Sequence, residues 1–358
     1  MMLKAGYFPY IFHFKVPGGT SRGILTEKPS WILKLWDSSE SEIFGLGEVS
    51  IIPGLSPEPI DKLLIELDHL VDEPSVYVNS NSRKLANFPS LQFAIETALL
   101  DLKQGGRRVL FPSEFTQGLK GIRTNGLIWM GAKEEMLLRI QEKLQQGFRC
   151  IKIKVGAVDF NHELELLQFI REHYTANTLE IRVDANGAFT SKEVMQKLEM
   201  LAKYQIHSIE QPIKQGQWAE MREVCLQSPI PVALDEELIG IWEDLRRNEL
   251  LDVIQPQYII LKPSLIGGLK ETARWSQMAV QRNIGWWVTS ALEGNIGLNA
   301  IAQWTFIQGS TMPQGLGTGQ IYTNNFNSPL EMRDEELWYN NDKKWSDFST
   351  INDKIDKT

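Results

Sequence analysis

Three acidic residues follow short apolar segments in the second half of the chain. Asp184 ends "LEIRVD", Glu210 ends "HSIE" and Asp235 ends "PVALD". The carboxyl ends of parallel strands meet at one edge of a sheet, so this pattern predicts three carboxylates at the same height. Acids that close would repel one another and take up protons unless a cation lay between them. Oxygen ligands suit a hard divalent ion, and we predict a site for Mg²⁺.

Lysines flank this group of acids on both sides. Lys154 ends "CIKIK" just before the first acid-bearing segment, and Lys262 ends "YIILK" just after the last one. Burial and like charge both disfavour the ammonium form, so we expect the pKa of each to be lowered. A neutral lysine can act as a general base. Lys152 points to the same side of its strand as Lys154 but lies one layer deeper.

Each of these residues alone has an ordinary structural explanation. A single acid at a strand end commonly caps a helix, and alternating lysines protect exposed edge strands from aggregation. The recurrence of acids on three successive strands, between two lysines, favours a catalytic site instead. The five histidines are scattered, and Cys150 and Cys225 have no partners at ligand spacing, so neither zinc nor a disulfide is predicted.

Apolar segments and amphipathic helices alternate from Thr124 to Gly319 and would position these residues. A strand with its helix takes roughly 25 to 30 residues, which is typical of a parallel β/α barrel. A doubly wound open sheet is the main alternative, but its glycine-rich phosphate turn is missing after the first strand. We predict a small α+β domain over residues 1–115, the barrel over 116–320, and a segment over 321–358 that packs back on the first domain.

Composition limits the classes of partner. The chain has 358 residues and a net charge of −8, so it lacks the basic surplus that nucleic-acid binding requires. Its first residues, "MMLKAGYFPYIFHFK", lack the apolar core of a signal peptide, and no run of about 18 apolar residues follows. We therefore expect a cytoplasmic protein with a small-molecule partner and no nucleic acid or membrane. The sequence does not indicate the oligomeric state.

The motifs at the strand ends resemble those of the enolase superfamily, in its muconate-lactonising subgroup. They read "KIK", "DAN", "EQP", "DEE" and "KP" on the second to sixth barrel strands. Within the subgroup, "GLGEVSIIPGLSPE", "IILKPSLIGGL" and "SALEGNIGLNAIAQW" are most similar to the o-succinylbenzoate synthase family. The resemblance implies an α/β fold, a modified TIM barrel of (β/α)7β type, with an N-terminal α+β capping domain completed by the C-terminal tail. Gln211 stands where many relatives carry an acid, a change we expect to be tolerated.

The resemblance also implies an activity and residue roles. The activity is a Mg²⁺-dependent carbon–oxygen lyase of menaquinone biosynthesis, which dehydrates 2-succinyl-6-hydroxy-2,4-cyclohexadiene-1-carboxylate to o-succinylbenzoate in a syn elimination through an enediolate. Lys154 is the implied base, Lys262 stabilises the anion, and Asp184, Glu210 and Asp235 bind Mg²⁺, with Mn²⁺ as a substitute. The implied substrate and supporting residues are Lys152, Arg182, Asn186, Glu236, Ser290, Ser21, Arg22, Pro53 and Gly54.

Other activities of the subgroup remain open at this point. Muconate cycloisomerases, N-acylamino acid racemases and dipeptide epimerases share the two-lysine site, and a fold with its site gives the partial reaction but not the substrate. Dipeptide epimerases typically carry acids near the eighth strand, where this chain reads "PQGLGTGQ" without one. The non-enzyme alternative is a barrel that binds a metal or ligand without turnover, but such a protein has no need for opposed lysines.

Overall fold

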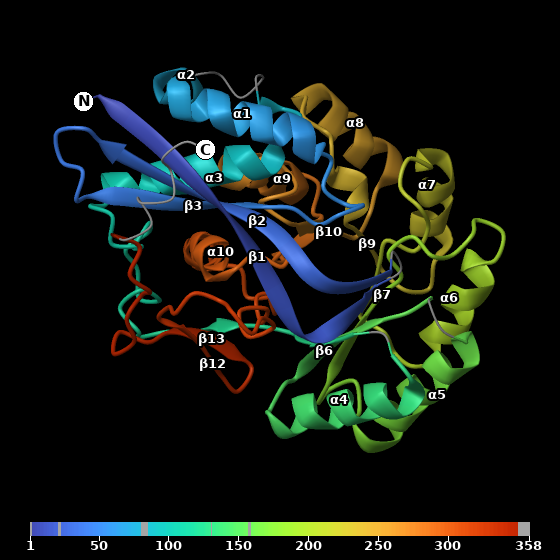
Figure 1. The fold of residues 1–358 in the computed structure, drawn as a ribbon. Helices are drawn as coiled ribbons and strands as arrows, with labels where there is room; N and C mark the ends of the chain where they lie inside the picture. Colours follow the sequence, from blue (N-terminus) through green and yellow to red (C-terminus); the bar gives the residue numbers. More distant parts are fainter. Residues whose placement is uncertain (1, 21–22, 80–84, 130, 157–158, 350–358) are drawn as a thin grey trace.

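A computed structural model describes residues 2–20, 23–79, 85–129, 131–156 and 159–349 (Figure 1). Ser21 and Arg22, two of the predicted substrate residues, lie outside these ranges. Among the described residues, no helix combines the length and the apolar character needed to cross a membrane.

The N-terminal part is a three-stranded antiparallel sheet of β1 (Leu3–Thr20), β2 (Gly23–Asp37) and β3 (Phe44–Ser50). Helices α1 (Ile60–Asp72), α2 (Pro74–Asn79) and α3 (Pro89–Lys103) accompany it. Strands β1 and β2 form a hairpin whose pairing continues to Thr20 opposite Gly23. This hairpin reaches over the strands of the second part (Figure 1).

Helix α3 lies unusually close to strand β3. A Cβ atom at Gly47 would lie 2.0 Å from the carbonyl oxygen of Ala94, and one at Gly45 would lie 1.9 Å from that of Ala98. Two glycines at alternate positions of β3 therefore allow the helix backbone to contact the strand directly.

The second part is a curved parallel sheet whose seven strands pair in chain order. Its strands are β5 (Gly126–Ile128), β6 (Cys150–Lys154), β7 (Glu180–Asp184), β8 (Ser208–Glu210), β9 (Val232–Leu234), β10 (Tyr258–Leu261) and β11 (Gly285–Val288). Its helices are α4 (Lys133–Gln145), α5 (Phe160–His173), α6 (Val194–Ala202), α7 (Trp218–Gln227), α8 (Asp244–Ile254), α9 (Gly268–Val280) and α10 (Asn295–Ile307).

Residues 314 and 315 close this sheet into a barrel. The backbone N–H of Gln314 donates to the Arg123 carbonyl at 2.8 Å, and the backbone N–H of Gly315 donates to the Val288 carbonyl at 2.8 Å. The weak apolar segment "PQGLGTG" thus joins the two ends of the sheet in the place of an eighth strand, and the predicted (β/α)7β barrel is confirmed.

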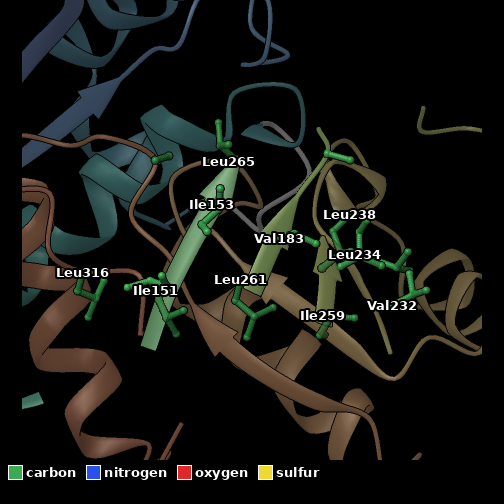
Figure 2. Close-up of a cluster of buried hydrophobic side chains, with 14 of the residues drawn as sticks. Ile151, Ile153, Val183, Val232, Leu234, Leu238, Ile259, Leu261, Leu265 and Leu316 are labelled. Carbon is green, nitrogen blue, oxygen red and sulfur yellow. The ribbon is translucent and has the colours of Figure 1, made fainter. Parts of the chain in front are cut away.

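Side chains alternate between the inside and the outside of the barrel. Ile151, Ile153 and Val183 are at most 1% exposed and belong to the large apolar core between strands and helices (Figure 2). Lys152 and Lys154 come from the same strand but point to the other side, because successive side chains of a strand face opposite ways. The interior of the barrel is therefore polar near the carboxyl ends of its strands.

Two glutamates of the N-terminal part cap helices of the barrel. Both oxygens of Glu48, on β3, accept backbone N–H groups at the start of α10, from Gly294 at 2.7 Å and Gly297 at 3.0 Å. Glu96, on α3, accepts from the amides of Leu269 and Lys270 at the start of α9. Neither helix has a capping side chain of its own, so the free N–H groups of α9 and α10 are satisfied from the other part of the chain.

The C-terminal segment contacts both parts. Strands β12 (Leu330–Arg333) and β13 (Glu336–Tyr339) form a small sheet with β4 (Ile122–Arg123), which precedes the barrel. Phe326 packs against Tyr10 of β1 in a tilted arrangement with ring centroids 4.5 Å apart, and the Tyr10 hydroxyl donates to the Asn324 carbonyl. The predicted boundaries at 115 and 320 stay a prediction, since these contacts give no sharp limit between the segments.

Candidate active site

The strand register brings the predicted lysine and acids together. Lys154 pairs with Asp184 across β6 and β7, and Asp184 pairs with Glu210 across β7 and β8. Asp235 and Lys262 each directly follow a strand, β9 and β10. All five side chains are buried. Regular pairing of parallel strands therefore places them at one end of the barrel.

Ion pairs connect these residues into one cluster. Lys152 Nζ lies 2.9 Å from Asp184 Oδ2 and 2.7 Å from Glu210 Oε2, so one ammonium group bridges two of the acids. Lys154 Nζ lies 2.8 Å from the same Asp184 oxygen. On the other side, Lys262 forms a short ion pair with Asp235 and lies 3.9 Å from Glu210.

The charges shift the pKa values of these groups in different directions. Burial raises the pKa of Asp184, but Lys152, Lys154 and Lys262 outweigh burial, so its pKa lies well below the usual range. Glu210 differs, because burial together with the neighbouring Asp184 holds its pKa well above the usual value.

The expected lowering of the lysine pKa is wrong for Lys262. Burial does lower the pKa of its ammonium group, but the carboxylates of Asp235, Glu210 and Glu236 outweigh burial, and the pKa is raised. The sequence-based argument counted burial and the opposed lysine but not the charges of three nearby acids.

Asn186 and Glu236 extend the cluster. The Asn186 side chain accepts a short hydrogen bond from Lys154 and donates to Glu236 Oε1 at 3.1 Å, while its backbone amide donates to Asp184 Oδ1 at 3.0 Å. Asn186 thus orients the ammonium group of Lys154.

Arg182 does not join this cluster. Its side chain lies one layer deeper in the barrel, where Nε donates to Glu180 Oε1 at 2.7 Å and Nη1 donates to the Pro313 carbonyl at 2.9 Å. The guanidinium carbon lies 4.2 Å from the centre of the Trp287 ring. The structure therefore does not support the expectation that Arg182 adds positive charge for a substrate, because its guanidinium group is held by Glu180, Pro313 and Trp287, whereas Lys152, opposite it on β6, reaches the acids.

A cavity of about 1060 Å³ opens above the cluster. Its wall includes the predicted residues Lys152, Lys154, Lys262, Asn186, Ser290 and Pro53, together with the apolar Phe14, Leu25, Ile52, Leu55 and Trp129. The three acids lie beneath the lysines and do not line it, and Gly54 does not line it either. The N-terminal part of the chain thus supplies one wall of the cavity and the barrel supplies the other.

Two features of this wall were not predicted. Trp129 directly follows β5, and applying the strand-end rule to the first barrel strand, as to the others, would have found it. The Ser290 hydroxyl is engaged within the protein, because it donates to Glu293 Oε2 at 2.6 Å and accepts from the Glu293 amide at 3.3 Å. Its contribution to the cavity wall therefore does not include a free hydroxyl.

The acids suit a divalent cation by their chemistry. Asp184, Glu210 and Asp235 offer only oxygen donors, and Glu210 Oε1 is buried without a hydrogen-bond partner. Within the described residues, however, no three acidic, histidine or cysteine side chains already form a group that could hold a metal, and the Lys152 ammonium lies between Asp184 and Glu210. The cluster is therefore held together by lysines in this structure, and Glu210 Oε1 is an oxygen that could accept a further ligand.

Comparison with known proteins is consistent across sequence and structure. Residues 135–341 match the model of the enolase C-terminal domain-like family. The chain is 48% identical over 352 residues to the o-succinylbenzoate synthase of Desulfotalea psychrophila, covering 88% of this chain and 94% of that protein. The crystal structure of MenC from the same organism covers 94% of this chain and all of that one, with 43% identity and a TM-score of 0.82.

A more distant structure shows the same fold. It is the dipeptide epimerase of Enterococcus faecalis, complexed with Mg and the dipeptide L-Leu-L-Tyr. It is 20% identical, covers 95% of this chain and 97% of its own, and has a TM-score of 0.80. One barrel with its N-terminal domain thus serves proteins of different names, so the fold alone does not identify a substrate.

Proposed function

Because the chain belongs to the enolase C-terminal domain-like family, we propose that it is a Mg²⁺-dependent o-succinylbenzoate synthase. The substrate would be 2-succinyl-6-hydroxy-2,4-cyclohexadiene-1-carboxylate, and the product would serve menaquinone biosynthesis. The observation that carries the proposal is the pair Lys154 and Lys262 in one cavity wall above three buried carboxylates. The similarity to a synthase along most of both chains supports this choice among the activities of the subgroup.

Asp184, Glu210 and Asp235 would hold the cation at the base of the cavity. When bound, Mg²⁺ would supply positive charge beside the substrate carboxylate and so favour the anion formed when the adjacent carbon loses its proton. Lys152, Lys154 and Lys262 contact the same acids, so these ammonium groups would have to give up carboxylate oxygens for the acids to hold a cation. Release of these ammonium groups from the acids would free Lys154 and Lys262 to face the ligand.

Lys154 would act as base and then as acid. In its neutral form, Nζ takes the proton from the carbon next to the carboxylate, and the electrons of that C–H bond give an enediolate. As the enediolate collapses, the C–O bond to the ring hydroxyl breaks, and Lys154 returns the proton so that water leaves. Since the same group serves both steps from one face, the elimination is syn. The hydrogen bond from Lys154 to the Asn186 side chain would keep Nζ in place.

Lys262 would face the opposite side of the ring. Its ammonium form would offset the negative charge of the enediolate. The two lysines would thus differ in protonation state, one acting as base and the other as electrostatic stabiliser.

The test uses the purified protein, Mg²⁺ and the cyclohexadiene substrate, with aromatisation followed by absorbance. We expect turnover in the wild type and a loss of at least about 100-fold in kcat for both Lys154→Ala and Lys262→Ala, since proton transfer by a positioned group contributes about 10² to 10⁴ in rate. Lys120→Ala is the matched control, because that side chain is 62% exposed and forms its ion pair with Glu114, which does not belong to the cluster. Circular dichroism would show that each variant is folded.

Two outcomes would overturn the proposal. The first is no turnover of this substrate together with clear epimerisation of dipeptides or racemisation of N-acylamino acids, which would leave the family intact but move the chain to another activity. The second is Mg²⁺ binding without turnover of any of these substrates, which would favour a binding protein. Wild-type rates in either lysine variant would refute the mechanism.

A further inference from the structure

We propose that Gln211 is a positioning residue that holds the acids in place, and that the site requires an amide there. This inference rests on the proposed function in one respect, since it concerns the residues that would hold Mg²⁺. Gln211 directly follows Glu210, is fully buried, and has a left-handed backbone with φ of 39°. Glutamine side chains are mostly exposed in proteins, so complete burial of this one is unusual, and a left-handed backbone is uncommon for any residue other than glycine.

The oxygen of this amide holds the turn that carries Asp235. Gln211 Oε1 accepts hydrogen bonds from the backbone N–H of Asp235 at 3.1 Å and of Glu237 at 3.3 Å. These two N–H groups lie on either side of Glu236, whose side chain is bonded to Asn186. The end of β8 is therefore tied through one side chain to the turn after β9, and Glu210 and Asp235 are fixed relative to each other.

The nitrogen of the same amide faces two acceptors. Gln211 Nε2 donates to the Ile213 carbonyl at 3.0 Å and to Glu237 Oε2 at 3.2 Å. The other oxygen of Glu237 accepts from the Gly216 amide at 2.8 Å. Two N–H donors on one side and two oxygen acceptors on the other define the orientation of the amide.

An acid of the same shape would satisfy only half of these partners. A glutamate at 211 could accept from Asp235 and Glu237 N–H, but its second oxygen would face the Ile213 carbonyl and the Glu237 carboxylate without a proton to donate. Removing the donor from a buried pair leaves an unsatisfied acceptor, and like charges in contact repel. We infer that the turn would shift, and that Asp235 would lose its place beside Glu210.

The test measures Mg²⁺ binding directly, without substrate, by calorimetry. For Gln211→Glu we expect the dissociation constant for Mg²⁺ to rise at least about tenfold, the lower end of the effect of groups that orient metal ligands. Activity at limiting Mg²⁺ should fall more than activity at saturating Mg²⁺, a difference that a merely destabilising change would not produce. Gln117→Glu, an exposed change with the same charge, is the control.

A reciprocal exchange distinguishes the proposed pairing from a general effect of the substitution. In the double variant Gln211→Glu with Glu237→Gln, the new amide at 237 can donate to the new carboxylate at 211, while the Ile213 carbonyl loses its partner. We expect this exchange to recover at least half of the lost affinity on a logarithmic scale. Should Gln211→Glu alone not fold, the exchange variant must fold and bind Mg²⁺.

The outcomes separate this inference from the proposed function. Unchanged Mg²⁺ affinity in Gln211→Glu would overturn it, as would an exchange variant no better than the single one, or a wild type that takes up no Mg²⁺. A wild type that binds Mg²⁺ but does not dehydrate the proposed substrate would refute the synthase assignment alone, and the Mg²⁺ titrations would still decide the role of Gln211.

Discussion

Replacing Glu48 by glutamine should destabilise the whole chain although Glu48 lies outside the cavity. Its carboxylate extends from β3 to the start of α10 and is fully buried. Each of its oxygens accepts a hydrogen bond from a backbone N–H group there. Lys28 Nζ, also buried, lies 3.9 Å away. The amide nitrogen of a glutamine would meet an N–H group instead of accepting from it, and Lys28 would lose a countercharge.

The magnitude follows from these contacts. A hydrogen bond to a charged group contributes about 1.5 to 3 kcal/mol, and breaking a buried ion pair costs about 3 to 5 kcal/mol. Since glutamine keeps one acceptor, we expect a loss of about 3 kcal/mol in the free energy of unfolding for Glu48→Gln. Thermal unfolding would then occur about 4 °C lower, because the entropy of unfolding grows with chain length. Glu40→Gln, an exposed change in the same part of the chain, should shift neither quantity.

Chemical denaturation of both variants at neutral pH is the assay. Burial is the main cause that raises the pKa of Glu48, while Lys28 and the two N–H groups lower it. A change below about 0.5 kcal/mol in Glu48→Gln would show that Glu48 is already protonated, and would refute the argument that a charge caps α10. In a double-mutant cycle with Lys28→Met, the ionised carboxylate should give a coupling of about 1 kcal/mol or more.

Two further predictions concern pH and packing. Burial raises the pKa of Glu58 to about 7 in the folded chain. The stability that this group contributes is therefore complete below about pH 4.5 and is lost as the pH rises through about 7. Urea denaturation from pH 5 to 8 should show the free energy of unfolding falling by at most about 3 kcal/mol, and Glu58→Gln should abolish this fall. An equal decline in that variant would contradict the assignment. Gly47→Ala should cost more than about 3 kcal/mol, because its Cβ would collide with the Ala94 carbonyl. Gly317→Ala, whose nearest neighbour is 3.8 Å away, is the control in thermal denaturation, and similar stability of the two variants would show that α3 can move away from β3.

The barrel and the cluster at its mouth could be predicted because parallel strands obey simple geometry. Side chains alternate, strands pair in chain order, and their last residues meet at one end, so Lys154, Asp184 and Glu210 could be placed together from their positions in the sequence. The motifs then narrowed the family further than the strand pattern alone could.

What could not be predicted depends on contacts between side chains of different strands. The pKa of Lys262 follows from three carboxylates whose distances no sequence pattern gives. Arg182 lies opposite Lys152 in the strand register, but its side chain is held by Glu180, Pro313 and Trp287, and no sequence pattern gives those contacts. The partners of the Gln211 amide could not be predicted either, because they lie on the turn after β9, 24 positions further along the chain in the case of Asp235.

The contacts of the tail have a consequence for the order of events during synthesis. Tyr10, in the first strand, donates a hydrogen bond to Asn324, 314 residues later, and its ring packs against Phe326. The barrel closes through residues 314 and 315, which are also made late. At about 5 to 20 residues per second, a ribosome needs roughly 15 to 60 s to make the intervening chain. During that interval Tyr10 of β1 lacks its contacts with Asn324 and Phe326, and the barrel remains an open sheet. We therefore expect nascent chains of this protein to depend on chaperones until the last residues have emerged.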